Sequence, residues 1–227
     1  MANKIQTIND AFRICTNHVR LVGLLNELSV ATNRHGDNIV VSYVGIVIVN
    51  DSYIKIHGKT TSSSPRFKSD VERLSELKAN MNAKFTDGEL VSTDFSDECS
   101  LVYIEGSISS SRSVRAGYIC TSDTDSCYML GTITGVPVEI VNDNTIKVLI
   151  INNHFHNVIT LKCNRYGSAL QAMLNQTISF SIKTHNNINE TPLSLVYTTK
   201  LADEIPQSVI DSALMEHDIY IATRNNE

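Results

Sequence analysis

The chain has 227 residues, of which 42% are hydrophobic and 19% charged, and it carries a formal net charge of -5. This composition excludes general disorder, no apolar run is long enough to span a bilayer, and the N-terminus lacks the apolar core of a signal peptide. Five cysteines without a Cys-x-x-Cys pair argue against a disulfide framework, so we expect reduced thiols, a cytoplasmic location and no membrane partner.

The first part of the chain predicts an antiparallel meander that follows a polar arm or short helix. Gly23 and Gly45 interrupt two apolar strands, and a glycine inside a strand often marks a bend of the kind a small barrel needs. Turn signals separate the strands at Thr32–Asp37 and at Asn50-Asp51. The expected elements are the arm at residues 1–17 and strands at His18–Leu28, Ile39–Val49 and Asn50–Lys59.

A change of hydrophobic period after Pro65 predicts a helix. Apolar residues recur every three or four positions, which is the spacing of an amphipathic helix: Phe67, Val71, Leu74, Leu77 and Met81. A strand is expected at Leu101–Ile108, followed by a flexible basic hairpin loop at Ser109–Arg115.

The order of elements then repeats, although the residues themselves do not. Strands are expected at Tyr128–Thr134, Thr145–Asn152 and Asn157–Cys163, then a helical segment at Tyr166–Leu174 and a strand at Thr177–Lys183. The last segment, Thr191–Glu227, predicts a strand and a helix beginning near Pro206, without a place in either module.

One predicted strand, Asn50–Lys59, has two unlike faces. Side chains alternate along a strand, so Ile54 and Ile56 point to a core while the opposite face carries a ring, an imidazole and two ammonium groups. Aromatic rings between lysines can stack on bases while the lysines neutralise phosphates. A solvated antiparallel strand explains the same pattern. The residues of that face are Tyr53, Lys55, His57 and Lys59.

The net negative charge does not exclude a nucleic-acid partner. Six acidic residues lie between Thr191 and Glu227 against two basic ones, and a second acidic group lies between Asp87 and Glu98. The rest of the chain is mildly basic and can carry a basic groove.

Two runs of sequence resemble bacterial-type single-stranded DNA-binding proteins. NHVRLVGLLNELSVATNRHGD, residues 17–37, is similar to their first strand and hairpin, and SLVYIEGSISSSRSV, residues 100–114, is similar to the strand after their helix. The chain differs from them in lacking Trp and an acidic tail with an apolar tip, and in having a second module. A phage or plasmid single-strand binder, or a related replication accessory protein, is the nearest description.

The resemblance implies a mainly β fold of two OB-fold-like, five-stranded Greek-key barrels, each with a short helix, and a C-terminal extension. The expected divisions are an N-terminal arm at 1–17, OB-fold domains at 18–116 and 117–190, and an extension with a helix at 191–227. It also implies single-stranded DNA as the ligand, with RNA left open, homo-oligomers, replication proteins as further partners, and a bacterial or infected host cell.

If the resemblance holds, we expect aromatic and imidazole rings to stack on bases and basic side chains to contact phosphates. Tyr43 could equally be a core residue, Tyr103 a dimer contact, and Phe155 an anchor into a neighbour. The stacking candidates are Tyr43, Tyr53, His57, Tyr103 and Phe155. The phosphate candidates are Lys55, Lys59, Arg66, Arg112, Arg115 and Lys147, with Lys162 and Arg165 as second choices.

No pattern predicts catalysis, a metal or a cofactor. His154, His156 and Cys163 lack the further ligand that structural zinc needs, and no phosphate loop or catalytic motif is present. Two functions remain: sequence-nonspecific single-stranded DNA binding in replication, recombination or repair, and a protein-interaction or structural β-barrel module of a larger assembly that does not bind nucleic acid.

Overall fold

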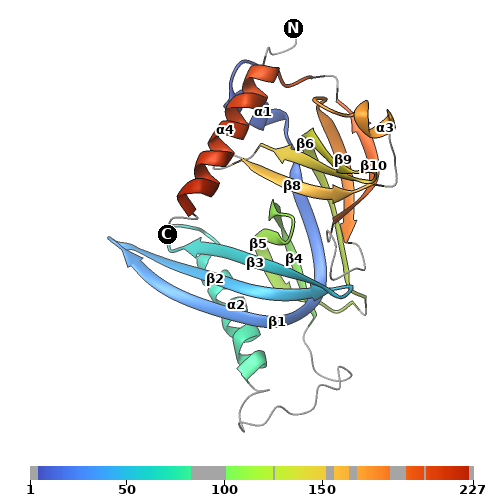
Figure 1. The fold of residues 1–227 in the computed structure, drawn as a ribbon. Helices are drawn as coiled ribbons and strands as arrows, with labels where there is room; N and C mark the ends of the chain where they lie inside the picture. The colour runs from blue at the N-terminus through green and yellow to red at the C-terminus, as the bar shows by residue number, and fades with distance from the viewer. Residues whose placement is uncertain are drawn as a thin grey trace. The chain divides into compact units, whose positions relative to one another are not determined.

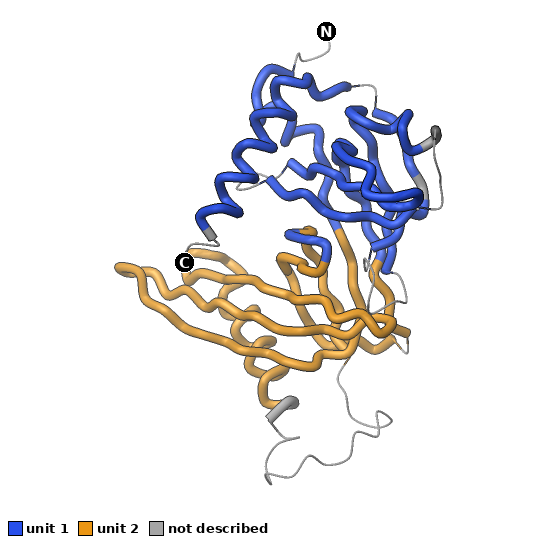
Figure 2. Tube along the Cα trace, viewed as in Figure 1, with its two compact units in different colours: residues 1–18, 109–111, 130–227 blue, residues 19–108, 112–129 orange. Residues whose placement is uncertain are grey.

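The computed structural model describes residues 5–82, 101–124, 126–151, 156–163, 168–184, 193–201 and 203–224. The chain forms two compact units, coloured in Figure 2. Unit 2 consists of Val19–Ile108 and Arg112–Met129, and unit 1 of Met1–His18, Ser109–Ser111 and Leu130–Glu227. No helix among the described residues is long and apolar enough to cross a membrane.

Unit 2 is a closed five-stranded barrel with one helix (Figure 1). Its strands lie in the order β1-β2-β3-β5-β4, and the β1–β4 pairing closes the ring. The β3–β5 pair is parallel, while β1–β2, β2–β3 and β1–β4 are antiparallel. The elements are β1 (Asn17–His35), β2 (Asn38–Val49), β3 (Ser52–Thr61), α2 (Phe67–Asn82), β4 (Leu101–Ser110) and β5 (Ser113–Thr121).

Unit 1 repeats this topology. Its strands lie in the order β6-β7-β8-β10-β9, a β6–β9 pairing closes the ring, and β8 and β10 are parallel. Both units therefore have the strand order of an OB-fold, which confirms the predicted fold class. The elements are α1 (Ile8–Ile14), β6 (Tyr128–Asn142), β7 (Thr145–Ile150), β8 (Asn157–Lys162), α3 (Ser168–Gln171), β9 (Ile178–Thr184), β10 (Leu193–Lys200) and α4 (Gln207–Arg224).

The barrel interiors follow the predicted alternation of side chains. In β4, Val102 and Ile104 are fully buried, and in β9 Phe180 is fully buried between exposed or half-buried neighbours. In α2, Leu74 and Leu77 are buried against the barrel while Glu72 is exposed. Each fully buried side chain of this size contributes on the order of 1.5–3 kcal/mol by leaving water.

Three strands differ from the sequence prediction. Ser113–Arg115, expected in a hairpin loop, opens strand β5, and the strand expected after Thr191 is β10, which pairs with β9 and β8. Strand β6 continues past Thr134 to Asn142 because a register shift after Pro137 lets the ladder with β7 go on. The domain boundaries given above remain a prediction.

The turn between β2 and β3 has a backbone that few residues adopt. Asn50 and Asp51 have φ angles of 47° and 62°. Two positive φ values in a two-residue loop are typical of a type I′ turn, whose twist matches that of the flanking strands, and Asn and Asp tolerate them better than other side chains. The turn fixes the register in which Ile48 lies opposite Tyr53.

Candidate nucleic-acid interface

The outer wall of unit 2 carries the predicted two-faced strand. On β3, Ile54 and Ile56 are buried in the barrel, and the alternate residues point outward. Each outward residue lies opposite an outward residue of β2, so the two strands form one surface. We call it the β2–β3 face: Ser42, Val44, Ile46 and Ile48 of β2 with Tyr53, Lys55, His57 and Lys59 of β3.

This face exposes apolar side chains to solvent. The exposed fraction is 54% for Tyr53 and 44% for Val44, and Ile46 and Ile48 are half-buried. An exposed apolar patch that is flanked by polar residues marks a place where a partner binds. A flat aromatic ring between aliphatic side chains offers a base a stacking surface.

Basic side chains lie on β3 and β5 beside the apolar part of the face. Lys55 and Lys59 are exposed on β3, and Arg115 of β5 lies beside His57 in the parallel register. The Nδ1 atom of His57 lies 3.4 Å from Oγ of Ser113, so the imidazole is held against β5. Arg112 is exposed at the β4–β5 turn, where its carbonyl accepts a hydrogen bond from the Lys55 N–H.

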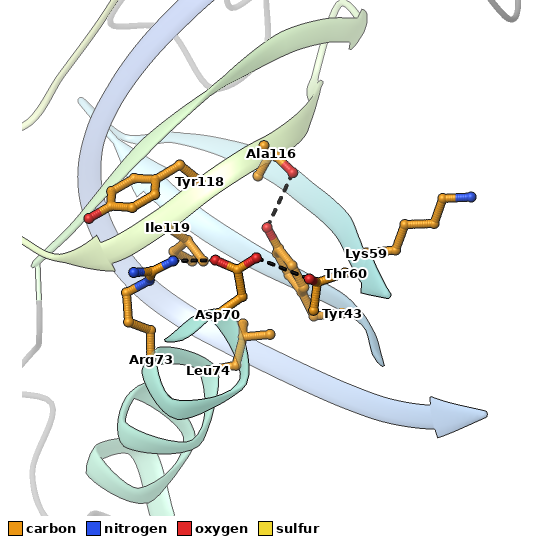
Figure 3. Close-up of a pocket in the computed structure, with 10 residues that line it drawn as sticks. Tyr43, Lys59, Thr60, Asp70, Arg73, Leu74, Ala116, Tyr118 and Ile119 are labelled. Carbon is orange, nitrogen blue, oxygen red and sulfur yellow. Dashed lines mark hydrogen bonds and ion pairs between the residues drawn. The ribbon is translucent and has the colours of Figure 1, made fainter. Parts of the chain in front are cut away.

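Helix α2 is fastened to this barrel by a polar network next to Lys59 (Figure 3). Thr60 Oγ1 donates to Asp70 at 3.0 Å, and the same carboxylate pairs with Arg73. The Arg73 guanidinium lies 4.7 Å from the centre of the Tyr118 ring, a cation–π contact. The network lines a small pocket. Lys59 borders this pocket, but its side chain points away from it, so the pocket belongs to the contacts that anchor the helix.

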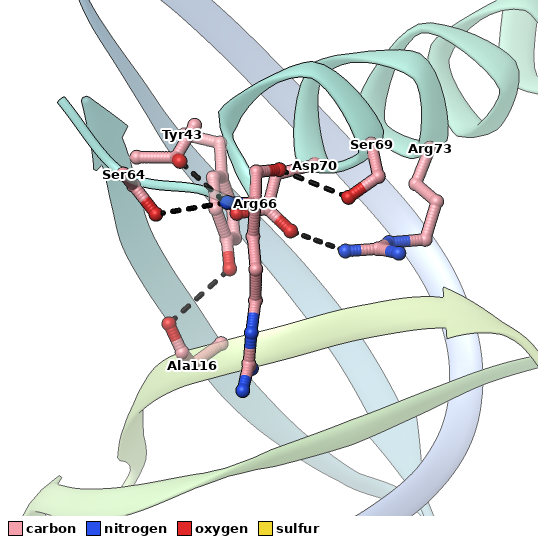
Figure 4. A network of polar contacts seen from close by, with 8 residues as sticks. Tyr43, Ser64, Arg66, Ser69, Asp70, Arg73 and Ala116 are labelled. Carbon is pink, nitrogen blue, oxygen red and sulfur yellow. Dashed lines mark hydrogen bonds and ion pairs between the residues drawn. The ribbon is translucent and has the colours of Figure 1, made fainter. Parts of the chain in front are cut away.

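Arg66 lies just before α2 and is exposed. Its N–H donates to Ser64 Oγ, and its carbonyl accepts hydrogen bonds from the Ser69 hydroxyl and the Asp70 N–H. The guanidinium extends away from this network (Figure 4). Arg66 therefore presents its charge to solvent from a fixed backbone.

Two of the predicted stacking residues are engaged elsewhere. Tyr43 is buried in the barrel and its hydroxyl donates to the Ala116 carbonyl at 3.3 Å; burial raises the pKa of its phenol to about 12. Tyr103 is half-buried on β4, and its hydroxyl donates to Glu105 at 2.5 Å, which raises the pKa of the phenol to about 12. Tyr43 is therefore not on the β2–β3 face.

Tyr103 lies on another part of the barrel wall. Its ring packs edge-to-face on Tyr118 at 6.4 Å between centroids, and Glu105 also pairs with Arg20 across the β1–β4 ladder. The aromatic cluster of Tyr103 and Tyr118 is not on the β2–β3 face.

The remaining candidates lie in unit 1 or outside the described residues. Lys147 on β7 pairs with Glu139 of β6 at 2.7 Å, so a phosphate would have to compete with a carboxylate. Lys162 on β8 is half-buried. Phe155 and Arg165 lie outside the described residues, as does His154. In the described ranges, no three His, Cys, Asp or Glu side chains gather as metal ligands.

The sequence did not identify the β2 side of the face. Val44, Ile46 and Ile48 stand in a run, IVVSYVGIVIV, that is apolar on both sides and reads as a fully buried strand. Tyr118 and Arg73 were also missed, because Tyr118 lies in the strand that the sequence analysis did not assign.

The sequence matches no protein-family model and no curated protein. Among solved structures, the fold is similar to the single-stranded DNA binding protein from Thermus aquaticus: the wild type has 10% identity and a TM-score of 0.44, over 85% of this chain and 96% of that one. A deletion variant of that protein has 8% identity and a TM-score of 0.44, over 85% and 98%. A Replication Protein A heterotrimer bound to ssDNA has 10% identity and a TM-score of 0.24, over 89% and 52%.

Proposed function

We propose that the protein binds single-stranded DNA without sequence preference and catalyses no reaction. The observation that carries this proposal is the β2–β3 face of unit 2, where an exposed tyrosine and aliphatic side chains lie among Lys55, Lys59 and Arg115. In OB-folds this wall is the one that binds oligonucleotides.

The geometry supports binding by stacking and charge. A base can lie on the Tyr53 ring and gain about 1–3 kcal/mol, and any base can do so because each has a π-face. Phosphates on either side then meet the ammonium groups of Lys55 and Lys59, with Arg115, Arg112 and Arg66 extending the positive surface. Stacking and phosphate contacts do not distinguish one base from another, so binding of this kind has no sequence preference.

We place this activity in DNA replication, recombination or repair, in a protein of phage or plasmid type that works in the cytoplasm. Homo-oligomers and contacts with replication proteins belong to the same proposal. A comparison of binding to DNA and to RNA of the same sequence tests the preference between them, because the 2′-hydroxyl of the ribose is the group by which a protein can tell them apart.

A fluorescence-anisotropy titration of labelled oligo-dT with the full chain at low salt tests the proposal. We expect saturable binding that weakens steeply as salt rises, because each phosphate contact releases counterions. Oligo-dA and a mixed sequence should bind within a few-fold of oligo-dT. Absence of binding at micromolar protein would reject the function.

The second candidate is a protein-interaction module. It is favoured by exposed apolar side chains in the second half of α4, where Met215 is 59% and Ile219 58% exposed. Light scattering with and without oligonucleotide separates the two candidates. The double substitution Tyr53→Ala with Lys55→Ala should abolish DNA binding and leave assembly intact, whereas assembly of the unmodified chain without any DNA binding would support the second candidate.

A further inference from the structure

In the topology of each barrel, β7 and β8 of unit 1 hold the places of β2 and β3 of unit 2, and each pair is an antiparallel ladder. Counted from the hairpin end, the pairs Val49–Ser52 and Ile48–Tyr53 of unit 2 correspond to Ile150–Asn157 and Leu149–Val158 of unit 1. Val158 therefore occupies the register position of Tyr53. We call the outer side of this hairpin the β7–β8 face: Lys147 and Leu149 of β7 with Val158, Thr160 and Lys162 of β8.

In unit 1 this position is covered by helices of the same unit. Leu149 is fully buried in a cluster with Ala11 of α1 and with Val209, Ile210 and Ala213 of α4. Val158 packs against the same cluster. Each of the three α4 residues has an exposed fraction of 4% or less, whereas Tyr53 of unit 2 has 54%.

Polar contacts fasten α4 at the start of β8. His156 is buried, and its Nε2 atom lies 3.1 Å from the Glu216 carboxylate. The next residue of the helix, His217, donates from Nδ1 to the His156 carbonyl at 2.8 Å. Glu216 and His217 thus bind the side chain and the backbone of one β8-flanking residue, and the helix cannot slide along the strand without breaking both contacts.

We infer that α1 and α4 cover the Leu149–Val158 end of the β7–β8 face, where a base would have to stack, so that unit 2 alone takes up single-stranded DNA although both units are OB-fold-like barrels. This inference rests on the proposed function. The buried contacts of α4 are those of a core, because displacing the helix would return Leu149, Val209, Ile210 and Ala213 to water together. Lys147 and Lys162 remain beside the cover, yet no base can stack at the position of Val158.

Paired alanine variants of the full chain test the inference. The probe is labelled oligo-dT of about 35 nucleotides, long enough for two barrels at up to ~16 nucleotides each. Lys55→Ala with Lys59→Ala should weaken binding at least ~10-fold, as expected for two lost phosphate contacts at low salt. Lys147→Ala with Lys162→Ala, the matched pair of unit 1, should change the affinity less than ~2-fold.

Variants with one introduced tryptophan give a second test by fluorescence, because the chain itself contains no tryptophan. Fluorescence of the Tyr53→Trp variant should be quenched when oligo-dT is added, and that of the Lys147→Trp variant should not change. Quenching in both, or equal loss of affinity in both alanine pairs, would overturn the inference and leave the proposed function standing. Absence of binding by the unmodified chain would instead reject the proposed function.

Discussion

The residue that the proposed binding depends on most is Tyr53. It is the most exposed aromatic side chain in the described part of unit 2, and it is held between Ile48 across the hairpin and Lys55 along the strand. Tyr53→Ala removes one stacking surface without opening the core. We expect oligo-dT affinity to fall by about 1–3 kcal/mol, or ~5- to ~150-fold, in an anisotropy titration.

The matched control is Tyr53→Phe, which keeps the ring and loses the hydroxyl. It should bind within ~2-fold of the unmodified chain if stacking is the source of the affinity. Equal loss in both variants would mean that the hydroxyl, and not the ring, makes the contact.

The turn residue Asp51 carries a second prediction at the residue scale. Its φ of 62° lies in the left-handed region, where a β-branched side chain is strained by about 1–2 kcal/mol. Asp51→Val should lower the free energy of unfolding by that amount in a denaturant titration. Asp51→Gly, which accepts the same φ, should leave it unchanged or higher; a loss as large as that of the valine variant would contradict this reading.

At the scale of elements, α2 depends on its anchor to β3. The Asp70 carboxylate accepts from Thr60 and pairs with Arg73, and both side chains of the ion pair are about one quarter exposed, 22% and 25%. Asp70→Ala leaves a hydroxyl and a guanidinium without their acceptor. We expect the free energy of unfolding to fall by about 1–3 kcal/mol.

Thermal unfolding measures this loss, and Glu72→Ala on the exposed side of the same helix is the control. The control should unfold within about 0.5 kcal/mol of the unmodified chain. DNA affinity of the Asp70→Ala variant should persist below its unfolding temperature, because the network lies beside the β2–β3 face and not on it.

The fastening of α4 to β8 predicts a pH dependence of stability. Burial lowers the pKa of His156 from its usual 6.5, an effect that the facing Glu216 carboxylate opposes and that His217 of α4 reinforces. The unfolded chain therefore binds more protons than the folded one between the lowered pKa and 6.5. The contribution of His156 to stability is complete above pH 6.5 and is lost as the pH falls through the lowered pKa.

Chemical denaturation across this pH range, with and without His156→Gln, checks the prediction. The difference in unfolding free energy between the unmodified chain and the variant should shrink on acidification. A difference that stays constant from pH 7.5 to below the lowered pKa would show that the imidazole does not titrate differently in the folded protein.

Alternation of side chains predicted the strands that have one polar face, but it did not identify strand β5. Strand β4 and strand β9 have clear inner and outer residues, so their buried sides were predicted from the sequence. Strand β5 was missed because serine, arginine and glycine separate its few apolar residues, a composition that also fits a loop. Its parallel pairing with β3 depends on residues far apart in the chain.

The proposed binding surface was also predicted only in part, because alternation identifies a face only where the two sides of a strand differ. The outward residues of β3 alternate with isoleucines, so the sequence placed Tyr53, Lys55, His57 and Lys59 on one face, as the structure does. Tyr43 shows the limit of the pattern: its strand is apolar on both sides, and the Ala116 carbonyl that accepts its hydroxyl lies in the unassigned strand β5. The packing of α4 on the β7–β8 face could not be predicted, because α4 lies about fifty residues after that hairpin in the chain.

At the scale of the whole molecule, a net charge of -5 coexists with the surface proposed to bind a polyanion. In the proposed function, therefore, a few local cations hold the DNA, and not the overall charge. Phosphate contacts reveal themselves in the slope of log affinity against log salt, which changes by ~0.7 for each contact with a single strand.

The most direct measurement is this salt slope for oligo-dT, determined with the unmodified chain and with the Lys55→Ala, Lys59→Ala double variant. We predict that the variant binds more weakly and that its slope is shallower by ~1.4, two contacts' worth. An unchanged slope with unchanged affinity would show that the nucleic acid, if bound at all, does not lie on the β2–β3 face.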